Sequence, residues 1–392
     1  MKWRNKGNEL DMYAETLLLD KSIEIFVFGC GIIGSRIGEI LKDYDVFKGY
    51  IDNDIRKQGC KKVGREVYSL DAFLYKKDKA YIVIAASKAN EKVIEKQLKE
   101  KGLFYGKDYF FATEFLQRIW PIIYTYLYNK VFVNLAQISL TERCTLKCKK
   151  CAHACYAVVN DAKDLSLDEV YKSADAFFSK VDYIQEFVLI GGEPLLYKDL
   201  SEAISYIGER YRKQINIFCI TTNGTILPSE EVLEMCKKYN VFFSVSNYVK
   251  QLPKLKKHYA RLIKVLEDNN IAYVLGREET EWMDYGFEYV NREDSEEELI
   301  KVFSSCNTPC REVRGNKYYY CVMARSVSEN LGLGVGQEDF LDLDKLTDDN
   351  YKKVLLEFNL GYSQKGYLDM CRHCHGNKAK NYPIPAAEQV ER

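Results

Sequence analysis

Three cysteines stand close together in the middle of the chain, at Cys144, Cys148 and Cys151. Their CxxxCxxC spacing suits iron, because thiolates bind iron strongly and a [4Fe–4S] cluster usually takes four of them. Three protein ligands leave one iron of such a cluster open to a small molecule. A zinc site is the alternative, with Cys155 or His153 completing a set of four ligands, although zinc favours paired CxxC or Cys/His units. We therefore predict an iron–sulfur cluster with one open iron.

A glycine-rich turn, Gly191-Gly-Glu-Pro194, follows the apolar run Phe187-Val-Leu-Ile. Two adjacent glycines let the backbone approach a ligand closely. The carboxylate of Glu193 can pair with an ammonium group. The turn is therefore a candidate for holding a small molecule beside the cysteines.

Together, the cysteines and this turn resemble the radical S-adenosylmethionine (SAM) superfamily over residues 131–300. Members carry CxxxCxxC after the first strand and GGEP after the second strand of a partial (β/α)6 barrel. The resemblance implies that the open iron binds SAM and that the cluster cleaves it. The implied SAM-binding residues are Gly191, Gly192, Glu193, Pro194, Thr222, Asn223, Ser244 and Ser246. The glycine-rich turn would hold the methionyl amino group, and the two serines the ribose and carboxylate. Lys150 departs from the family pattern, which usually has an aromatic residue near adenine at that position.

A second group of cysteines lies further along the sequence. Its members are Cys306, Cys310, Cys321, Cys371 and Cys374. A hairpin-like segment with its turn at Gly315-Asn316, followed by the CxxC at Cys371, resembles the twitch domain, a shortened relative of the SPASM domain. That resemblance implies one auxiliary [4Fe–4S] cluster, since a full SPASM domain needs about seven cysteines for two clusters. A zinc site, a c-type haem attachment at Cys371–His375 and simple burial of the thiols are the alternatives.

Five cysteines for four cluster ligands leave one spare, either Cys306 or Cys310. A thiol held beside a substrate can donate a hydrogen atom, because its S–H bond is weak. Local packing of the spare cysteine is the alternative. The spacing alone leaves both its identity and its role open.

A third motif lies near the start of the chain, where Gly29, Gly31 and Gly34 follow a strand-like run and precede a helical one. With Asp52 at the end of the next strand, this pattern fits a dinucleotide-binding fingerprint. It is also similar to the N-terminal domains of sugar-modifying enzymes from bacterial surface-polysaccharide pathways, which bind a nucleotide-sugar. That resemblance implies that the domain holds the nucleotide of the substrate. A degenerate domain used for docking or dimerisation is the alternative.

Strands alternate with helices over most of the chain, which predicts an α/β fold with parallel sheets. Residues 1–120 read as a small Rossmann-like doubly wound domain, with strands at 22–28, 47–51 and 80–86 and a helix at 90–101. Residues 131–300 read as the barrel, with strands at 131–138, 186–190, 215–220, 241–245 and 271–275 and helices at 166–179 and 200–210. Residues 301–380 read as a Cys-rich twitch-type domain with a helix at 348–358. Residues 381–392 read as a flexible tail.

The composition narrows the class of protein. Of 392 residues, 47% are hydrophobic and 29% charged, which is typical of a globular protein. Lys plus Arg and Asp plus Glu both number 57, so the charge gives no sign of nucleic-acid binding. We found no signal-peptide pattern or membrane-spanning run, and we expect a cytoplasmic protein. The scattered Cys30, Cys60, Cys219 and Cys236 are expected to be buried hydrophobes.

The leading hypothesis is an enzyme whose SAM-derived radical removes hydrogen from a carbinol carbon of a carbohydrate or polyol, carried on a nucleotide diphosphate. Epimerisation follows if a cysteine or tyrosine returns hydrogen to the opposite face. Oxidation to a ketone follows if the auxiliary cluster accepts an electron. A ribosomal-peptide-modifying enzyme and a non-catalytic iron–sulfur electron carrier are the alternatives. Flavodoxin or ferredoxin is the expected reductant.

Overall fold

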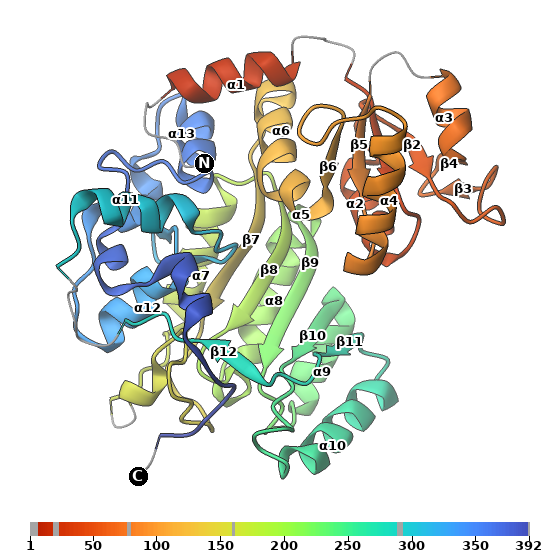
Figure 1. Cartoon of the computed structure of the whole chain (residues 1–392). Coiled ribbons are helices and arrows are strands. Elements are labelled where there is room, and N and C mark those ends of the chain that lie inside the picture. The colour runs from red at the N-terminus through yellow and green to blue at the C-terminus, as the bar shows by residue number, and fades with distance from the viewer. Residues whose placement is uncertain (1–6, 19–22, 77–79, 159–160, 288–292, 391–392) are drawn as a thin grey trace. The chain divides into compact units, whose positions relative to one another are not determined.

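The computed structural model describes residues 7–18, 23–76, 80–158, 161–287 and 293–390, and they form two compact units (Figure 1). One unit comprises the described residues of 11–128. The other comprises those of 129–392 together with those before Asp11. None of the described helices is long and apolar enough to cross a membrane.

The unit of residues 11–128 is built on one sheet with the strand order β3-β4-β2-β1-β5-β6. Neighbouring strands run parallel except at the β3–β4 edge. The strands are β1 (Ile25–Phe28), β2 (Phe47–Ile51), β3 (Lys61–Lys62), β4 (Arg65–Tyr68), β5 (Tyr81–Ile84) and β6 (Tyr109–Phe111). The helices are α2 (Ile32–Leu41), α3 (Leu70–Lys76), α4 (Lys88–Glu100), α5 (Ala112–Glu114) and α6 (Trp120–Tyr128), and α1 (Asn8–Leu18) precedes them. The apolar residues of the predicted strands form its core, including Phe28, Ile51 and Ile84.

The second unit contains a sheet with the strand order β11-β10-β9-β8-β7-β13-β14-β15. The strands from β11 to β13 are parallel, whereas β14 and β15 are antiparallel to their neighbours. The parallel strands are β7 (Phe132–Ser139), β8 (Tyr183–Ile190), β9 (Ile215–Thr222), β10 (Val241–Val245), β11 (Tyr273–Leu275) and β13 (Arg311–Arg314). The antiparallel strands are β14 (Lys317–Tyr319) and β15 (Phe340–Asp342). The predicted strands and the hairpin turn between β13 and β14 are confirmed.

Helices of this unit follow the strands, and serine caps begin several of them. They are α7 (Leu167–Phe178), α8 (Leu200–Tyr211), α9 (Glu230–Tyr239), α10 (Leu255–Asp268), α11 (Glu296–Ser305), α12 (Val322–Asn330) and α13 (Tyr351–Asn359). Ser166 and Glu169 form a reciprocal capping box at the start of α7, which satisfies two otherwise unpaired backbone N–H groups. One face of the strands packs on these helices, through residues such as Ala136, Ile138 and Phe187.

The sixth parallel strand differs from the expected barrel order. The resemblance implies a strand beyond β11, but β12 (Glu281–Met283) pairs instead with β16 (Pro383–Pro385) in a separate two-stranded sheet. The parallel neighbour that extends the sheet is β13, which adds on the far side of β7 through Arg311 and Glu312.

The prediction of a flexible tail over residues 381–392 is wrong for its described part. Besides the β12–β16 pairing, Ala387 is fully buried, and Glu388 and Val390 make backbone hydrogen bonds to the cysteine loop at Lys149 and Lys147. The polar composition of the segment concealed these contacts, because they are made mainly by its backbone.

Candidate functional site

The loop that carries the first cysteines leaves the end of β7 and is anchored before it reaches Cys144. The Arg143 guanidinium forms an ion pair with Asp164 at 2.6 Å and donates to the Leu196 carbonyl at 2.6 Å. Thr141 Oγ1 donates to the same Asp164 carboxylate at 2.6 Å. A bidentate, charge-assisted contact of this kind fixes orientation as well as position. These contacts therefore fix the backbone just before Cys144.

The three thiols lie in this loop among apolar side chains and hydrogen-bond donors. The Leu146 backbone N–H and the Asn223 side-chain amide point at Cys144 Sγ, at 3.4 and 3.6 Å. The Gln389 side-chain amide points at Cys148 Sγ, at 3.3 Å. Burial raises the pKa of Cys144 and of Cys148 to about 12. Donors aimed at sulfur suit a bound cluster, since hydrogen bonds to the sulfurs tune iron–sulfur centres.

Cys151 and Cys155 are paired at the end of the loop. Cys155 Sγ donates to the His153 carbonyl at 3.9 Å, and the closeness of the two thiols lowers the pKa of Cys151 and raises that of Cys155. Within the described ranges, no three Cys, His, Asp or Glu side chains are placed so as to hold a metal ion directly. The donor set of three thiols in one loop, with amide donors around them, nevertheless fits a cluster better than a single cation. Cys144, Cys148 and Cys151 remain the predicted ligands.

The glycine-rich turn packs directly on this loop. A Cβ on Gly191 would lie 2.5 Å from the Thr141 carbonyl oxygen, and one on Gly192 would lie 2.2 Å from that of Arg143. Gly192 N–H donates to the Thr141 carbonyl at 2.7 Å. Any side chain at either position would therefore force the two loops apart. The two glycines are therefore needed at least for the close packing of these two loops.

The Glu193 carboxylate is fully buried and is used within the protein. It accepts hydrogen bonds from Thr222 Oγ1 at 2.7 Å, from the Asn223 N–H at 2.9 Å and from the Leu195 N–H at 3.2 Å. Burial raises its pKa to about 7. The side chain thus ties the turn after β8 to the end of β9, a role that the sequence did not signal. Its pairing with an ammonium group remains a prediction.

The ends of β9 and β10 meet the same loop. Asn223 donates to Thr145 Oγ1 at 3.1 Å, beside its contact with Cys144. The Ser246 N–H donates to the Thr222 carbonyl at 3.0 Å, and Ser244 pairs in register with Thr221 of β9. The structure therefore gathers the predicted SAM-binding residues around the carboxyl ends of adjacent parallel strands.

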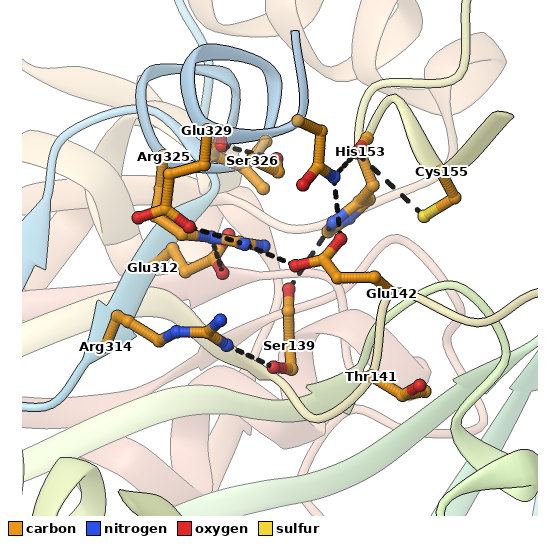
Figure 2. Close-up of polar contacts among 12 residues, drawn as sticks. Ser139, Thr141, Glu142, His153, Cys155, Glu312, Arg314, Arg325, Ser326 and Glu329 are labelled. Carbon is orange, nitrogen blue, oxygen red and sulfur yellow. Dashed lines mark hydrogen bonds and ion pairs between the residues drawn. The ribbon is translucent and has the colours of Figure 1, made fainter. Parts of the chain in front are cut away.

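A buried ion cluster links this loop to α12 (Figure 2). The Arg325 guanidinium, fully buried, contacts Glu142 at 2.7 Å and Glu312 at 2.6 Å. Burial opposes ionisation of Glu142, but Arg325 and Asn330 outweigh it and lower its pKa. Burial raises the pKa of Glu312. Arg325 Nη2 has no hydrogen-bond partner among the described residues. Sequence reasoning missed this cluster, because isolated charged residues in helices and strands usually face solvent.

The inner face of the sheet, opposite the helices, carries many polar side chains. We call the polar face the set Gln137, Ser139, Glu186, Thr221, Ser244 and Glu312, which the strand registers place on one side. His153 reaches it from the cysteine loop, near Gln137 at 3.5 Å and Ser139 at 3.4 Å. Glu186, Thr221 and Ser244 are partly exposed. The face is therefore polar and partly open beside the loop.

The second group of cysteines is gathered from separate elements. Cys306 follows α11, Cys321 precedes α12, and Cys371 and Cys374 lie in or beside a 3-10 turn at Asp369–His373. Burial raises the pKa of Cys321, and the neighbouring thiols of Cys306 and Cys374 raise it further. Burial raises the pKa of Cys371, and the nearby thiols of Cys374, Cys306 and Cys321 raise it further.

Cys310 has different neighbours. Burial raises the pKa of Cys310, and the charges that act on it are those of Arg311, Glu186 and Glu312. Two of these belong to the polar face. The charges acting on Cys310 thus differ from those acting on Cys321, but both thiols pack against the same apolar cluster, so which of Cys306 and Cys310 is spare remains a prediction.

The glycine loop of the first unit has one open position. A Cβ on Gly29 would lie 2.5 Å from the Ala85 backbone oxygen, and one on Gly34 would lie 1.8 Å from the Gly29 backbone oxygen. No atom lies within 4 Å of a Cβ built on Gly31. The Asp52 carboxylate accepts from the Cys30 N–H at 2.8 Å and pairs with Lys57 at 3.2 Å. Asp52 therefore braces the loop itself. Its contact with a ribose remains a prediction.

Part of this unit matches a known family of proteins. Residues 138–267 match the Radical SAM superfamily. GTP 3',8-cyclase of Syntrophomonas wolfei subsp. wolfei is 32% identical over 137 residues, which cover 34% of this chain and 41% of that protein. GTP 3',8-cyclase of Ectopseudomonas mendocina is 33% identical over 95 residues, 24% of this chain and 28% of that protein. The chain thus spans only about a quarter to two fifths of these relatives.

Among solved structures, that of BtrN in complex with AdoMet and 2-DOIA aligns with a TM-score of 0.41 and 15% identity, over 66% of this chain and 97% of that one. The superfamily match covers the cysteine loop, the glycine-rich turn and the ends of β8, β9 and β10. The matched segment therefore resembles a radical SAM superfamily domain, a match that implies SAM and a [4Fe–4S] cluster as cofactors.

Proposed function

We propose that this protein uses SAM to remove hydrogen from a carbinol carbon of a carbohydrate or polyol, and that it epimerises that carbon. The observation that carries the proposal is the polar face beside the cysteine loop. A substrate with many hydroxyl groups needs many hydrogen-bonding partners, because an unpaired buried polar group is costly. Glu186, Thr221 and Ser244, the partly exposed members of the polar face, offer such partners.

SAM bound at a cluster held by Cys144, Cys148 and Cys151 would supply the radical chemistry that removes a hydrogen atom from the substrate carbon. The chain's own residues then decide the outcome. Cys310, beside Glu186 and Glu312, is the proposed donor: its S–H bond breaks and a new C–H bond forms on the opposite face. The resulting sulfur radical is restored by one electron and one proton, with flavodoxin or ferredoxin as the class of reductant. Cys306, Cys321, Cys371 and Cys374 are the proposed ligands of an auxiliary [4Fe–4S] cluster.

Oxidation to a ketone is the competing outcome, with that auxiliary cluster as electron acceptor. The test uses anaerobically reconstituted protein with SAM, dithionite and a panel of CDP-, UDP- and GDP-linked sugars and polyols in D₂O. Epimerisation predicts solvent deuterium at one carbon and a gain of one mass unit. A product two mass units lighter means oxidation. If no member of the panel stimulates 5′-deoxyadenosine formation, the carbohydrate proposal fails and a peptide substrate becomes the leading hypothesis.

The unit of residues 11–128 is proposed to hold the nucleotide part of that substrate. Gly31 supports this, because its open side lets a phosphate approach the backbone at the start of α2. Gly31→Val places a side chain in that space. It should raise the apparent KM for the nucleotide-linked substrate and leave substrate-free SAM cleavage unchanged. An unchanged KM would favour the docking alternative.

A further inference from the structure

The segment of residues 383–390 lies across the first cysteine loop, and we call it the strap. Its first part is β16, which pairs with β12, and the Ala386 N–H donates to the Thr280 carbonyl at 3.2 Å. Its second part runs antiparallel to the cysteine loop. There the Lys149 N–H donates to the Glu388 carbonyl at 2.7 Å, and the Val390 N–H donates to the Lys147 carbonyl at 2.8 Å.

Side chains add to this backbone pairing. Ala387 is fully buried in an apolar cluster with Leu146 and Cys148, against which Trp282 packs. Lys149 and Glu388 form an ion pair at 2.7 Å, but both side chains are more than a third exposed, so this pair adds little. The strap is therefore held mainly by backbone hydrogen bonds and by burial of Ala387.

The strap delivers one side-chain amide to a cysteine sulfur. Gln389 Oε1 accepts from the Lys147 N–H at 2.8 Å, and Gln389 Nε2 donates to the Ala387 carbonyl at 2.7 Å and to Cys148 Sγ at 3.3 Å. These partners fix the amide orientation, because the reverse orientation would set two N–H donors against each other and an oxygen against the Ala387 carbonyl. The N–H group must therefore face the sulfur.

We propose that Gln389 tunes the reduction potential of the cluster held by Cys144, Cys148 and Cys151, and that the strap shields the Cys148 side of that cluster. This inference rests on the cluster being present at those three residues. A hydrogen bond to a thiolate ligand stabilises the reduced, more negatively charged cluster. Removing the donor should therefore make reduction harder.

The first test is a redox titration of the reconstituted protein, following the electron paramagnetic resonance signal that changes when SAM is added. Gln389→Leu should shift its midpoint to a more negative potential. Glu388→Gln is the matched control, because it breaks the exposed ion pair on the same strap and leaves the amide–sulfur contact intact, so its midpoint should equal that of the wild type. An unchanged midpoint in Gln389→Leu would refute the tuning role.

The second test needs no cluster. In iron-free protein, alkylation of each cysteine is followed by peptide mass spectrometry. Cys60 is the internal reference, because it is exposed, contrary to the burial predicted from the sequence. Ending the chain after Pro385 should raise the rate at Cys148 relative to Cys60 by about tenfold or more, since Cys148 is buried with Ala387. An equal ratio would refute the shield. If instead the wild type assembles no SAM-sensitive cluster, the proposed function fails as well.

Discussion

The two groups of cysteines are held in place in different ways. The first group lies within a single loop between β7 and α7, and neighbouring backbone and amide groups point at its sulfurs. The second group is assembled from the end of α11, the start of α12 and the turn at Asp369–His373. Ligands that are close in sequence can be recognised from spacing. Ligands brought together by the fold can be assigned only from the structure.

Each group is nevertheless braced by one fully buried carboxylate. Glu193 ties the glycine-rich turn to the end of β9 beside the first group. Asp339 accepts from the Asp369 N–H at 2.7 Å and the Gly336 N–H at 3.1 Å, and so holds the turn that carries Cys371. Burial raises the pKa of Glu193 to about 7 and that of Asp339 to about 6. A buried carboxylate therefore holds the backbone near each cysteine group, although the two groups are assembled differently.

The largest expected effect is the loss of SAM cleavage when a cysteine of the first group is replaced. Cys144→Ala should abolish SAM cleavage, because it removes a ligand of the cluster with the open iron. The variant should still bind the cluster of the second group. It should therefore retain about four of the about eight iron atoms that the wild-type chain binds. Iron and sulfide analysis with a 5′-deoxyadenosine assay checks both. Loss of all the iron would mean that the two groups do not assemble independently.

The next largest effect is expected at the buried ion cluster that links the first cysteine loop to α12. Arg325→Met leaves Glu142 and Glu312 buried without their cation, and should lower the free energy of unfolding by about 3–5 kcal/mol. Urea denaturation measures this change. Lys301→Met, which breaks an exposed pair with Glu298, is the control and should change stability by less than about 0.5 kcal/mol. Equal effects would show that the buried cluster does not support the fold.

The buried carboxylates predict a pH dependence of stability. The folded-state pKa of Glu193 lies above its ordinary value of 4.5, so its contribution is fully present below about pH 4.5 and is lost as pH rises through about 7. That loss amounts to about 3 kcal/mol. The urea midpoint of the wild type should therefore fall more steeply between pH 5 and pH 8 than that of Glu193→Gln. If the urea midpoints of the wild type and of Glu193→Gln changed equally with pH, Glu193 would not be the titrating group.

The last comparison, within the second group, tests which of Cys306 and Cys310 is the spare cysteine. Cys306→Ala should lose the iron of the second group, about half of the total, because Cys306 lies with Cys321 and Cys374. Cys310→Ala should keep all of the iron and lose epimerisation in the D₂O assay. The opposite pattern would exchange their roles.

Much of the barrel could be predicted because its strands are continuous apolar runs, such as Phe187–Ile190, and its loops carry Cys144 and Gly191 at recognisable spacings. Three features could not. Arg325 becomes a core residue through ion pairs with Glu142 and Glu312, which lie on other elements. The choice between Cys306 and Cys310 depends on where α11 and β13 place them. The strap binds through its backbone, which leaves no side-chain pattern to read.

The most direct test of the central claim, that the first cysteine group holds a cluster with an iron open to SAM, is the electron paramagnetic resonance spectrum of the reduced protein with and without SAM. We expect SAM to change the signal in the wild type and in Cys306→Ala, and we expect no SAM-dependent change in Cys148→Ala. A wild-type cluster signal that SAM leaves unaltered would contradict it.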